Sequence, residues 1–587
     1  MAIYLKKQLS QHIKDIIEKT FSEYKLNDFS VRIENPPKID MGHYSSPCAM
    51  DLAKILKSNP RKIATELYQA IIENKKSDSL PANLIEKISV EGPGFINFYV
   101  DDQFLSKILL SSYSTSSNIE QLKKDSPFKE EKIIFEFVSA NPTGPLNIVS
   151  ARAASVGDSI CNVLEICGFQ IAREYYVNDF GNQISLLGQS LCYRYLQSKG
   201  EEIELPENCY QGEYIKDILS SILLKDSSLR ESLEESYVSN FDLKKFIESF
   251  SPTLGLLATE KLLETQQKDL QAFNVNFDNF FKEASLHKAN KVMQTFDDLK
   301  QRDVLYQKEN AWFFKSTDYD DDKDRVVLRS DGRPTYLLAD ITYHRDKIQR
   351  GFHKIYNIWG PDHHGYIARL KGSLKALGFG EKKGEGFDVL IAQQVNLMEK
   401  GKPVVMSKRL GKFQTMKDLI DKIPVDVSRY FFANRSLGSH LDFDLELALE
   451  KSNENPVYYI QYAHARIHSI FQQNNYNFDS FDISIKNLTL EKGFFSATRK
   501  ELLINILKLQ EEVYDISRNF EIQRLPAYLH NLASIFTSFY HEKENRVKTV
   551  LENDKSTGEA LLQLCKLTAN TIKTGLTLIG VTSPKKM

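Results

Sequence analysis

The segment Ile133-Ile-Phe-Glu-Phe-Val138, followed by Ser139-Ala-Asn-Pro-Thr-Gly-Pro-Leu146, carries the clearest fold signal in the sequence. Its first part is a short apolar run rich in branched and aromatic residues, which is typical of a buried strand. Its second part contains two prolines and a glycine, which indicates a turn. From about Asn147 to Ile166 apolar residues recur at helical spacing, and Phe169–Val177 is a second strand-like run. The order strand, turn, helix and strand predicts a βαβ unit, whose helix start is a frequent phosphate-binding position.

Polar residues in this segment point to a site. A carboxylate inside an apolar strand needs a partner, because burial of an unpaired charge is costly, so we expect Glu136 to be paired. Asn141, Asn147 and Ser150 gather further polar groups around the helix start. The alternative is a packed βαβ unit whose proline-rich turn binds nothing, and this segment alone leaves both readings open.

Length and composition limit the class of protein. At 587 residues the chain is too long for one core, so we expect three or four domains. A hydrophobic fraction of 42% and a charged fraction of 26% are typical of a soluble globular protein. A net charge of −2 gives no overall basic field for a nucleic acid, although a local basic face can exist within a neutral total.

The cysteines and the N-terminus indicate the compartment. Six scattered cysteines without a Cys-x-x-Cys pair favour buried thiols in a reducing environment. No apolar run reaches membrane-spanning length without charges, and lysines follow too closely after Met1 for a signal peptide. We therefore expect a cytoplasmic protein with no membrane partner.

The pattern along the chain predicts three domains. Residues 1–112 are expected to form a small α+β domain, with helices and then a strand pair around a Gly-Pro-Gly turn. Residues 128–444 are expected to form an α/β domain with a doubly wound parallel sheet, Rossmann-like, interrupted by a helical insertion at about 185–300. Buried-strand candidates near its end are Lys354–Trp359 and Phe387–Gln393. Residues 445–587 are expected to form an all-α domain.

A second loop, Lys400–Gln414, follows the last predicted parallel strand and has Met406, Ser407 and Lys408 at its centre. Taken alone, it is compatible with a solvated basic loop. Combined with the turn before Asn147, it indicates a nucleotide held at a helix start and covered by a lysine loop, which is an arrangement for phosphoryl chemistry.

The chain resembles the class I aminoacyl-tRNA synthetases, and among them the bacterial arginyl-tRNA synthetases, over nearly its whole length. Several segments in family order are more specific than any single glycine-rich turn. Met406-Ser-Lys-Arg409 is similar to the KMSKS signature of the class. The other segments that carry the resemblance are Glu136–Leu146, Arg173–Gly181, Asp331–Ile341, Trp359–Tyr366 and Asn455–Arg466.

The sequence departs from the family pattern at both signatures. The His-x-Gly-His of the first signature is replaced by Asn147-Ile-Val-Ser150, so both imidazoles and the glycine are absent. Val405 stands in place of the first lysine of KMSKS, and Gly144 stands where some members carry a lysine. Lys408 is therefore the one motif lysine left for the phosphates.

The resemblance implies activation of arginine by ATP and its transfer to tRNA(Arg), through an arginyl-adenylate and without a protein nucleophile. Asn147, Ser150 and Lys408 would be the catalytic groups, the first two as hydrogen-bond donors and the lysine as neutraliser of the leaving pyrophosphate, with Mg²⁺ bridging the phosphate oxygens. The residues that the resemblance assigns to ATP binding are Ser139, Asn141, Pro142, Gly144, Asn147, Ser150, Met406, Ser407 and Lys408.

Arginine recognition requires planar acceptors for the guanidinium group. The residues expected to bind arginine are Glu136, Asn141, Tyr336, Asp340 and His363. Each retains a structural alternative: Asp340 as a helix-surface charge, Tyr336 as plain core and Asn141 as a turn former. The His363-His364 pair resembles part of a metal site, but no third ligand is nearby in the sequence, so we expect no metal ligands in the protein.

By resemblance, the N-terminal domain would bind the tRNA elbow and the helical C-terminal domain the anticodon, and a monomer is expected. Two other kinds of function remain open. A catalytically degenerate synthetase-like regulator that binds tRNA or arginine would explain the altered first signature. A stand-alone nucleotidyl transferase would explain the sheet but not the helical C-terminal domain. The presence of all the domains favours the synthetase.

Overall fold

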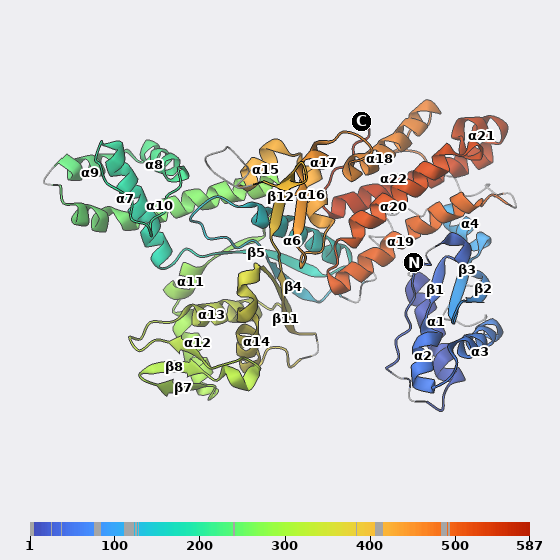
Figure 1. Ribbon diagram of the computed structural model, residues 1–587, viewed down its shortest axis with the longest axis horizontal. Coiled ribbons are helices and arrows are strands. Elements are labelled where there is room, and N and C mark those ends of the chain that lie inside the picture. Colours follow the sequence, from blue (N-terminus) through green and yellow to red (C-terminus); the bar gives the residue numbers. More distant parts are fainter. Residues whose placement is uncertain are drawn as a thin grey trace. The chain divides into compact units, whose positions relative to one another are not determined.

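A computed structural model of the chain divides into two compact units (Figure 1). Unit 1 comprises Met1–Ser126, Lys451–Leu578 and Thr582–Met587, and unit 2 comprises Pro127–Glu450 and Ile579–Val581. The structure describes residues 5–24, 26, 28–36, 38–74, 84–110, 123, 126, 128–238, 241–382, 384–404, 415–482, 490 and 493–587.

Unit 2 is built on a five-stranded sheet in the order β11-β10-β4-β5-β6, with every neighbouring pair parallel. In the central strand β4, successive residues from Ile133 to Glu136 are all buried, so both faces of the strand are covered. Burial on both faces is typical of an all-parallel sheet. The prediction of a parallel α/β sheet is confirmed. The strands are β4 (Lys132–Glu136), β5 (Gln170–Val177), β6 (Asn279–Lys282), β10 (Lys354–Trp359) and β11 (Gly386–Ile391).

Helices cover both faces of this sheet, as Figure 1 shows. On one face, α6 approaches so closely that a Cβ atom at Gly157 would lie 2.6 Å from the ring of Phe137. On the other face, Ile134 and Ile355 of the sheet pack against Leu374 of α14. The helix on the first face is α6 (Ile148–Ile166), against which α15 (Met416–Lys422) and α16 (Val425–Ala433) pack, and those on the second are α13 (Tyr336–Gln349) and α14 (Ile367–Ala376).

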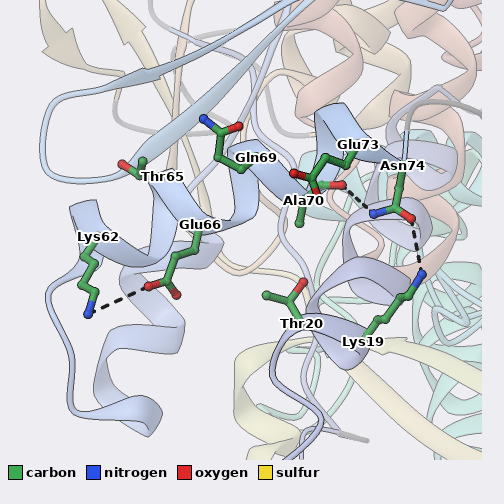
Figure 2. A pocket seen from close by; sticks show the side chains of 9 residues that line it. All are labelled: Lys19, Thr20, Lys62, Thr65, Glu66, Gln69, Ala70, Glu73 and Asn74. Atoms are coloured by element: carbon green, nitrogen blue, oxygen red, sulfur yellow. Dashed lines mark hydrogen bonds and ion pairs between the residues drawn. The ribbon is translucent and has the colours of Figure 1, made fainter.

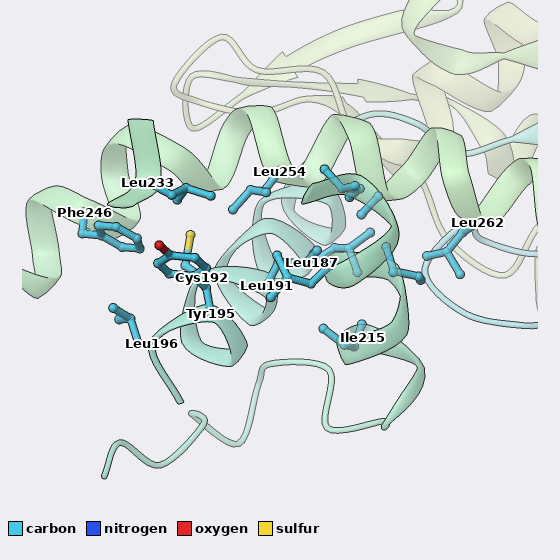
Figure 3. Packing of buried hydrophobic residues seen from close by; sticks show 14 residues of the cluster. Leu187, Leu191, Cys192, Tyr195, Leu196, Ile215, Leu233, Phe246, Leu254 and Leu262 are labelled. Carbon is cyan, nitrogen blue, oxygen red and sulfur yellow. The ribbon is translucent and has the colours of Figure 1, made fainter. Parts of the chain in front are cut away.

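A group of helices follows β5 and has its own apolar core (Figure 3). Its leucine, isoleucine and aromatic side chains, among them Leu187, Leu191 and Phe246, point toward one another between α7 and α10. The two helices touch at glycines, since a Cβ atom at Gly188 would lie 1.8 Å from the carbonyl oxygen of Ser251. The helices are α7 (Asn182–Ser198), α8 (Tyr214–Lys225), α9 (Ser227–Val238) and α10 (Leu243–Ala272).

The segment predicted to be helical up to about residue 300 contains one strand of the main sheet. Strand β6 has four residues and pairs in parallel with β5, with Asn279 opposite Glu174. Four residues are too few to show a two-residue alternation, and the sequence pattern therefore missed the strand. Two helices follow it, α11 (Glu283–Lys288) and α12 (Lys291–Gln301).

Two smaller sheets complete unit 2. The apolar segments around residues 304–329 form a separate antiparallel sheet in the order β7-β8-β9. The remaining elements are β7 (Leu305–Lys308), β8 (Ala311–Phe314), η2 (Ser316–Tyr319), β9 (Arg325–Leu328), η3 (Pro361–Tyr366), β12 (Val395–Glu399), β13 (Lys402–Pro403), β14 (Leu441–Asp444) and α17 (Leu445–Leu449).

A buried arginine joins the end of the chain to unit 2. The fully buried guanidinium of Arg429 donates to the carbonyl oxygen of Ile579 (2.8 Å) and to Asp158 Oδ2 (2.6 Å). Gly580, at φ 67°, lies so close that a Cβ atom there would be 2.2 Å from the guanidinium. Only glycine fits this position without a shift, since it has no Cβ and tolerates the left-handed conformation.

Unit 1 combines the two ends of the sequence. Its N-terminal part has an antiparallel sheet in the order β1-β3-β2, and its C-terminal part is helical. No helix in the described part of the chain is long and apolar enough to cross a membrane. The elements are α1 (Leu5–Thr20), η1 (Ile39–Met41), β1 (Tyr44–Ser46), α2 (Cys48–Leu56), α3 (Pro60–Glu73), β2 (Ile85–Glu91), β3 (Phe95–Val100), α4 (Asp102–Leu110), α18 (Pro456–Gln473), α19 (Ala497–Asn519), α20 (Arg524–His541), η5 (Lys543–Asn545), α21 (Val547–Asn553) and α22 (Lys555–Leu578).

A buried carboxyl group on α19 contacts the N-terminal part of unit 1. Glu511 Oε1 accepts from the backbone N–H of Lys6 (2.9 Å) and from the hydroxyl of Tyr44 (3.0 Å). Burial raises the pKa of Glu511 to about 7, against hydrogen bonds and the nearby ammonium of Lys508, which lower it. The folded state therefore binds a proton here that the unfolded state releases near pH 4.5.

The substitution Glu511→Gln is expected to stabilise the protein at high pH. Because the folded pKa lies above the unfolded one, the stability that the neutral group provides is full below pH 4.5 and is lost as the pH rises through about 7. Glutamine keeps the accepting oxygen and cannot ionise. The gain in the free energy of unfolding should approach about 3 kcal/mol at pH 8 and vanish near pH 4.5.

Melting temperatures of the two proteins between pH 4.5 and 8 measure this effect. Glu552→Gln, at an exposed position of α21, is the matched control and should show no gain that grows with pH. A constant difference between Glu511→Gln and wild type at every pH would contradict the assignment.

Candidate active site

The carboxyl ends of four parallel strands surround one cavity of about 350 Å³. The cavity opens between β4 and β10, where the chain order of the sheet reverses, which is the usual ligand-binding position of a doubly wound sheet. Predicted site residues lining it are Glu136, Ser139, Tyr336, Asp340 and His363. Further lining residues are Tyr176, Asn178, Glu283, Tyr343, His344, Asn357, Trp359 and Tyr366.

The backbone after β4 is strained where it borders the cavity. Val138 has φ 69° and Ser139 has φ 42°, which is costly for non-glycine residues and rare for a branched one. The hydroxyl of Ser139 donates to Glu136 Oε1 (2.9 Å) and accepts from the backbone N–H of Tyr176 (3.0 Å). These bonds hold the turn in its strained form and fix Ser139 between β4 and β5.

Glu136 has the partner that its place in an apolar strand predicted. Lys347 of α13 donates to Glu136 Oε2 (2.6 Å), and the ammonium is fully buried. The same ammonium lies 4.2 Å from the ring centroid of Tyr343. Both oxygens of Glu136 therefore already accept hydrogen bonds within the protein.

Asp340, Tyr336 and His363 reach the cavity from α13 and η3. Asp340 Oδ1 lies 3.1 Å from His344 Nδ1, and its carboxylate also accepts from the hydroxyl of Tyr366. Burial, and then the charge of Asp340, raises the pKa of Tyr366 well above its ordinary value. Tyr336 is 68% exposed, so it is not a core residue, and the ring of His363 lies 6.0 Å from that of Trp359.

Glu283 is a cavity carboxylate that sequence reasoning missed. It follows β6 directly, is buried, accepts from the hydroxyl of Tyr176, and has its Oε1 3.5 Å from His287 Nε2. In the amide orientation that satisfies its neighbours, Asn178 also donates to Glu283 Oε2 (3.2 Å). Burial raises the pKa of Glu283. Recognition of β6 as a strand of the sheet would have placed this residue at a strand end.

Three carboxylates, Glu136, Glu283 and Asp340, thus face one cavity with aromatic walls. Glu136 is neutralised from behind by Lys347, while Glu283 and Asp340 contact hydroxyl and imidazole groups. A concave acidic site with planar acceptors and aromatic rings suits a flat organic cation.

The other predicted residues lie on the turn and the helix start beside this cavity. Pro142 is buried, whereas Asn141 is exposed and is not among the residues that line the acidic cavity. Asn147 is the N-cap of α6: its Oδ1 accepts from the backbone N–H (2.8 Å) and the hydroxyl (3.1 Å) of Ser150. Because Oδ1 is the capping atom, the donor that Asn147 can offer to a ligand is Nδ2.

Buried groups of the helical insertion hold this turn. Gln266 of α10 donates from Nε2 to the carbonyl oxygens of Asn141 (3.2 Å) and Gly144 (2.8 Å). The hydroxyl of Tyr214 donates to the carbonyl oxygen of Thr143 (2.7 Å), and the hydroxyl of Tyr175 lies 2.9 Å from Gln266 Oε1. The insertion therefore fixes the backbone at the start of α6.

The loop with Met406, Ser407 and Lys408 lies outside the described residues. The described chain resumes at Thr415, which pairs with Asn147, and the backbone N–H of Met416 donates to the carbonyl oxygen of Leu146 (2.8 Å). Thr415 and Met416 therefore lie beside the start of α6.

A larger cavity, of about 680 Å³, lies between α1 and α3 and is unsuited to chemistry (Figure 2). Its polar side chains are solvated and contact one another: Lys19 Nζ donates to Asn74 Oδ1 (3.4 Å), and Lys62 lies 4.0 Å from Glu66. No strand end, strained backbone or buried charge points into it among the described residues.

Comparisons with known proteins match each part of this architecture. Residues 7–100 match the family described as arginyl tRNA synthetase N terminal domain, and residues 460–587 match the DALR anticodon binding domain. Residues 114–424, more than half of the chain, match the catalytic domain of class I (R) tRNA synthetases.

Relatives extend over the full length. The arginine–tRNA ligase of Leptospira interrogans is 44% identical over 99% of this chain and 97% of its own length. That of Bacillus licheniformis is 40% identical over 99% of both chains. The structure of Thermus thermophilus arginyl-tRNA synthetase has a TM-score of 0.73 over 99% of this chain and 100% of that chain; at 19% identity it supports the fold alone.

The parallel sheet, the site at its switch point and the matched catalytic domain define a class I aminoacyl-tRNA synthetase, a class of enzyme that uses ATP. Within that class, the families that match the N-terminal and catalytic domains and the full-length relatives are all specific for arginine by their names. The chain belongs to the arginyl-tRNA synthetase family. Nothing in the comparisons supports the alternative of a degenerate regulator.

The substitution Gln266→Met is expected to loosen the turn before α6. Methionine has a similar length but cannot donate to the carbonyl oxygens of Asn141 and Gly144, which are left without these bonds. Local opening of the turn should become easier by about 1–3 kcal/mol. Hydrogen exchange of peptides covering residues 139–147 should therefore become about 5- to 150-fold faster.

Gln271→Met, at an exposed position near the end of the same helix, is the matched control. Unchanged exchange of the turn in Gln266→Met would mean that Tyr214 and Tyr175 suffice to hold it.

Proposed function

We propose that the protein ligates arginine to tRNA(Arg) in two steps, through an arginyl-adenylate. The observation that carries this proposal is the acidic cavity at the switch point of the sheet, immediately beside the capped start of α6. One site suits a guanidinium group and the other suits phosphates, and they adjoin through the strained turn at Val138 and Ser139.

Arginine would bind with its guanidinium group in the acidic cavity. Asp340 and Glu283 offer carboxylate oxygens, and Glu136 fixes the cavity floor together with Lys347. Tyr336 and His363 would enclose the substrate, and Asn141, on the turn, would contact its α-amino or carboxylate end. This role of Glu283 adds to the residues expected from the sequence. The neutral, apolar amino acids offer no charge to these carboxylates, so they would be excluded.

ATP would bind at the start of α6. Asn147 Nδ2, the hydroxyl of Ser150 and the first backbone N–H groups of the helix would donate to phosphate oxygens, aided by the helix dipole. Lys408 would neutralise the β- and γ-phosphates, and Thr415, seven residues later, is paired with Asn147. Mg²⁺ would arrive with the nucleotide and share its phosphate charge. Among the described residues, no group of three or more His, Cys, Asp or Glu side chains is placed to hold a metal ion.

Catalysis would consist of positioning and electrostatic stabilisation. In the first step a carboxylate oxygen of arginine attacks the α-phosphorus of ATP in line, and pyrophosphate leaves. In the second step a ribose hydroxyl at the tRNA terminus attacks the carbonyl carbon of the adenylate, and AMP leaves. The donors at the start of α6 and Lys408 would stabilise the charge that develops on phosphate oxygens.

The tRNA would be bound largely by unit 1. Its helical part contains the segment that matches an anticodon-binding domain, and its N-terminal part is proposed to contact the tRNA elbow. We further infer a cytoplasmic monomer. All six cysteines are buried thiols outside disulfides, which fits a reducing compartment.

The decisive experiment is charging of tRNA(Arg) with labelled arginine, alongside adenylate formation with ATP and arginine alone. Charging that depends on ATP and arginine is the expected result. Binding of tRNA or arginine without any charging would favour the regulator, and nucleotidyl transfer without charging would favour a stand-alone transferase.

The substitution Asp340→Asn is expected to raise the KM for arginine far more than the KM for ATP. It removes one negative charge from a charge-assisted contact with the guanidinium, which should cost about 1.5–3 kcal/mol, or about 10- to 150-fold in KM. Steady-state charging at varied arginine and ATP measures both constants. A rise in the ATP constant alone would mean that Asp340 does not bind arginine.

The substitutions Lys408→Ala, Asn147→Ala and Ser150→Ala are expected to lower kcat in pyrophosphate exchange with tRNA present. Lys408→Ala should have the largest effect, up to about 3–4 kcal/mol in the transition state, because Val405 provides no second ammonium. Asn147 also caps α6, so Asn147→Ser, which keeps a capping oxygen, separates the loss of the donor from the loss of the cap. Lys382→Ala, at an exposed position outside this loop, is the control. Indifference to all three substitutions would place the phosphates elsewhere.

A further inference from the structure

Five polar side chains form a continuous series of polar contacts beside the acidic cavity. Glu136, Lys347, Asn357, His344 and Asp340 are linked in this order, and we call them the α13 relay. The links are Lys347 to Glu136 (2.6 Å) and to Asn357 Oδ1 (3.3 Å), Asn357 Nδ2 to His344 Nε2 (2.9 Å), and His344 Nδ1 to Asp340 Oδ1 (3.1 Å). Lys347, Asn357 and His344 are almost completely buried, so water cannot replace these partners.

The ammonium at one end dictates the orientation of the amide next to it. Lys347 Nζ has three donors and no acceptor. The atom of Asn357 that faces it must therefore be the oxygen, since a flipped amide would turn its NH₂ group toward the ammonium. Asn357 is held in place because it lies directly opposite Glu136 in the pairing of β10 with β4. The amide nitrogen of Asn357 consequently faces His344.

The amide in turn dictates which ring nitrogen of His344 carries the proton. A neutral imidazole has one N–H group and one bare nitrogen, and the hydrogen bond at one nitrogen sets the tautomer. His344 Nε2 faces an N–H donor, so it is the bare nitrogen. The proton is therefore on Nδ1, which lies 2.9 Å from the backbone oxygen of Asp340 and 3.1 Å from its carboxylate. Both neighbours of Nδ1 are acceptors, as this tautomer requires.

We propose that Lys347 and Asn357 are positioning residues that hold His344 in its Nδ1–H tautomer, and that His344 thereby orients the Asp340 carboxylate for arginine. The inference rests on the proposed role of Asp340 in arginine binding. In the opposite tautomer, the lone pair of Nδ1 would face the carboxylate and push it away.

The orientation of Asp340 matters because its ligand is planar. Bidentate pairing with a guanidinium group requires the carboxylate plane to be fixed, and supporting hydrogen bonds are what fix it. His344, on the following turn of α13, donates from Nδ1 to the backbone oxygen of Asp340 and thereby holds this N–H 3.1 Å from the carboxylate, and the hydroxyl of Tyr366 donates to the carboxylate itself. The relay also connects two of the three cavity carboxylates, since it starts at Glu136 and ends at Asp340.

The tautomer can be observed directly in the full-length protein labelled with ¹⁵N-histidine. The chain has 12 histidines, and the His344 resonances are identified by their loss in His344→Asn. Wild type is expected to show a protonated Nδ1 and a bare Nε2 at His344. Asn357→Asp places an accepting oxygen opposite Nε2 and is expected to protonate that nitrogen. A bare Nδ1 in wild type would overturn the proposal.

Steady-state charging tests the consequence for arginine. His344→Asn keeps an amide donor at the position of Nδ1 and should leave the KM for arginine within about threefold of wild type. His344→Leu and Asn357→Asp should raise it by about tenfold or more, with the KM for ATP within about twofold. Asn290→Asp, an exposed position with the same change of charge, is the matched control and should have no effect.

The outcomes separate this inference from the proposed function. If Asp340→Asn raises the arginine KM but His344→Leu does not, the relay is refuted and the arginine site stands. If Asp340→Asn also leaves the constant unchanged, both fail. If Asn357→Asp does not fold, the wild-type spectrum and the comparison of His344→Asn with His344→Leu still test the proposal. If His344 had only a structural role, these two variants would not differ in the KM for arginine alone.

Discussion

The buried ion pair between Lys347 and Glu136 is the interaction on which the centre of unit 2 depends. Glu136 ends β4, and Lys347 reaches it from α13, a helix 211 residues further along the chain. Removing one partner of such a pair typically costs about 3–5 kcal/mol, because the other is left as an uncompensated buried charge. The ion pair therefore fixes the position of α13 relative to β4, which apolar packing alone would determine less precisely.

The pair belongs to a polar row that crosses the sheet. Asn357, Glu136, Glu174 and Asn279 lie opposite one another on β10, β4, β5 and β6. Glu174 accepts from Tyr343 (2.7 Å) and from both terminal nitrogens of Arg350, and Asn279 donates to it (2.7 Å). Two successive carboxylates of the row are thus bound by residues of α13 or its C-cap. Glu136 and Asn357 of this row line the cavity, so the sheet fixes the position of one of its three carboxylates.

Features that depend on residues close together in the sequence could be predicted, whereas features that depend on contacts between distant segments could not. The limits of β10 and the start of α6 could be predicted because apolar runs and prolines mark them within a few residues. The sequence pattern also predicted that Glu136 has a partner. It could not show that the partner is Lys347, because the two residues are 211 positions apart in the chain. Glu283 was missed because β6 is too short to show a period, and the relay through His344 was missed because it exists only once α13 lies on the sheet.

Stability alone does not explain a charged pair at this position. Well-packed apolar residues of similar volume often match or exceed the stability of a buried ion pair. An apolar pair would leave Asn357 free to turn its amide either way, however, and His344 would then face Asp340 with either nitrogen. Lys347 differs from any apolar residue in that it can only donate. This single property fixes the direction of the hydrogen bonds from Glu136 to His344, and with it the ring nitrogen that carries the proton beside Asp340. The charge at this position therefore fixes the direction of the hydrogen bonds. A binding site for a planar cationic group requires such fixed directions.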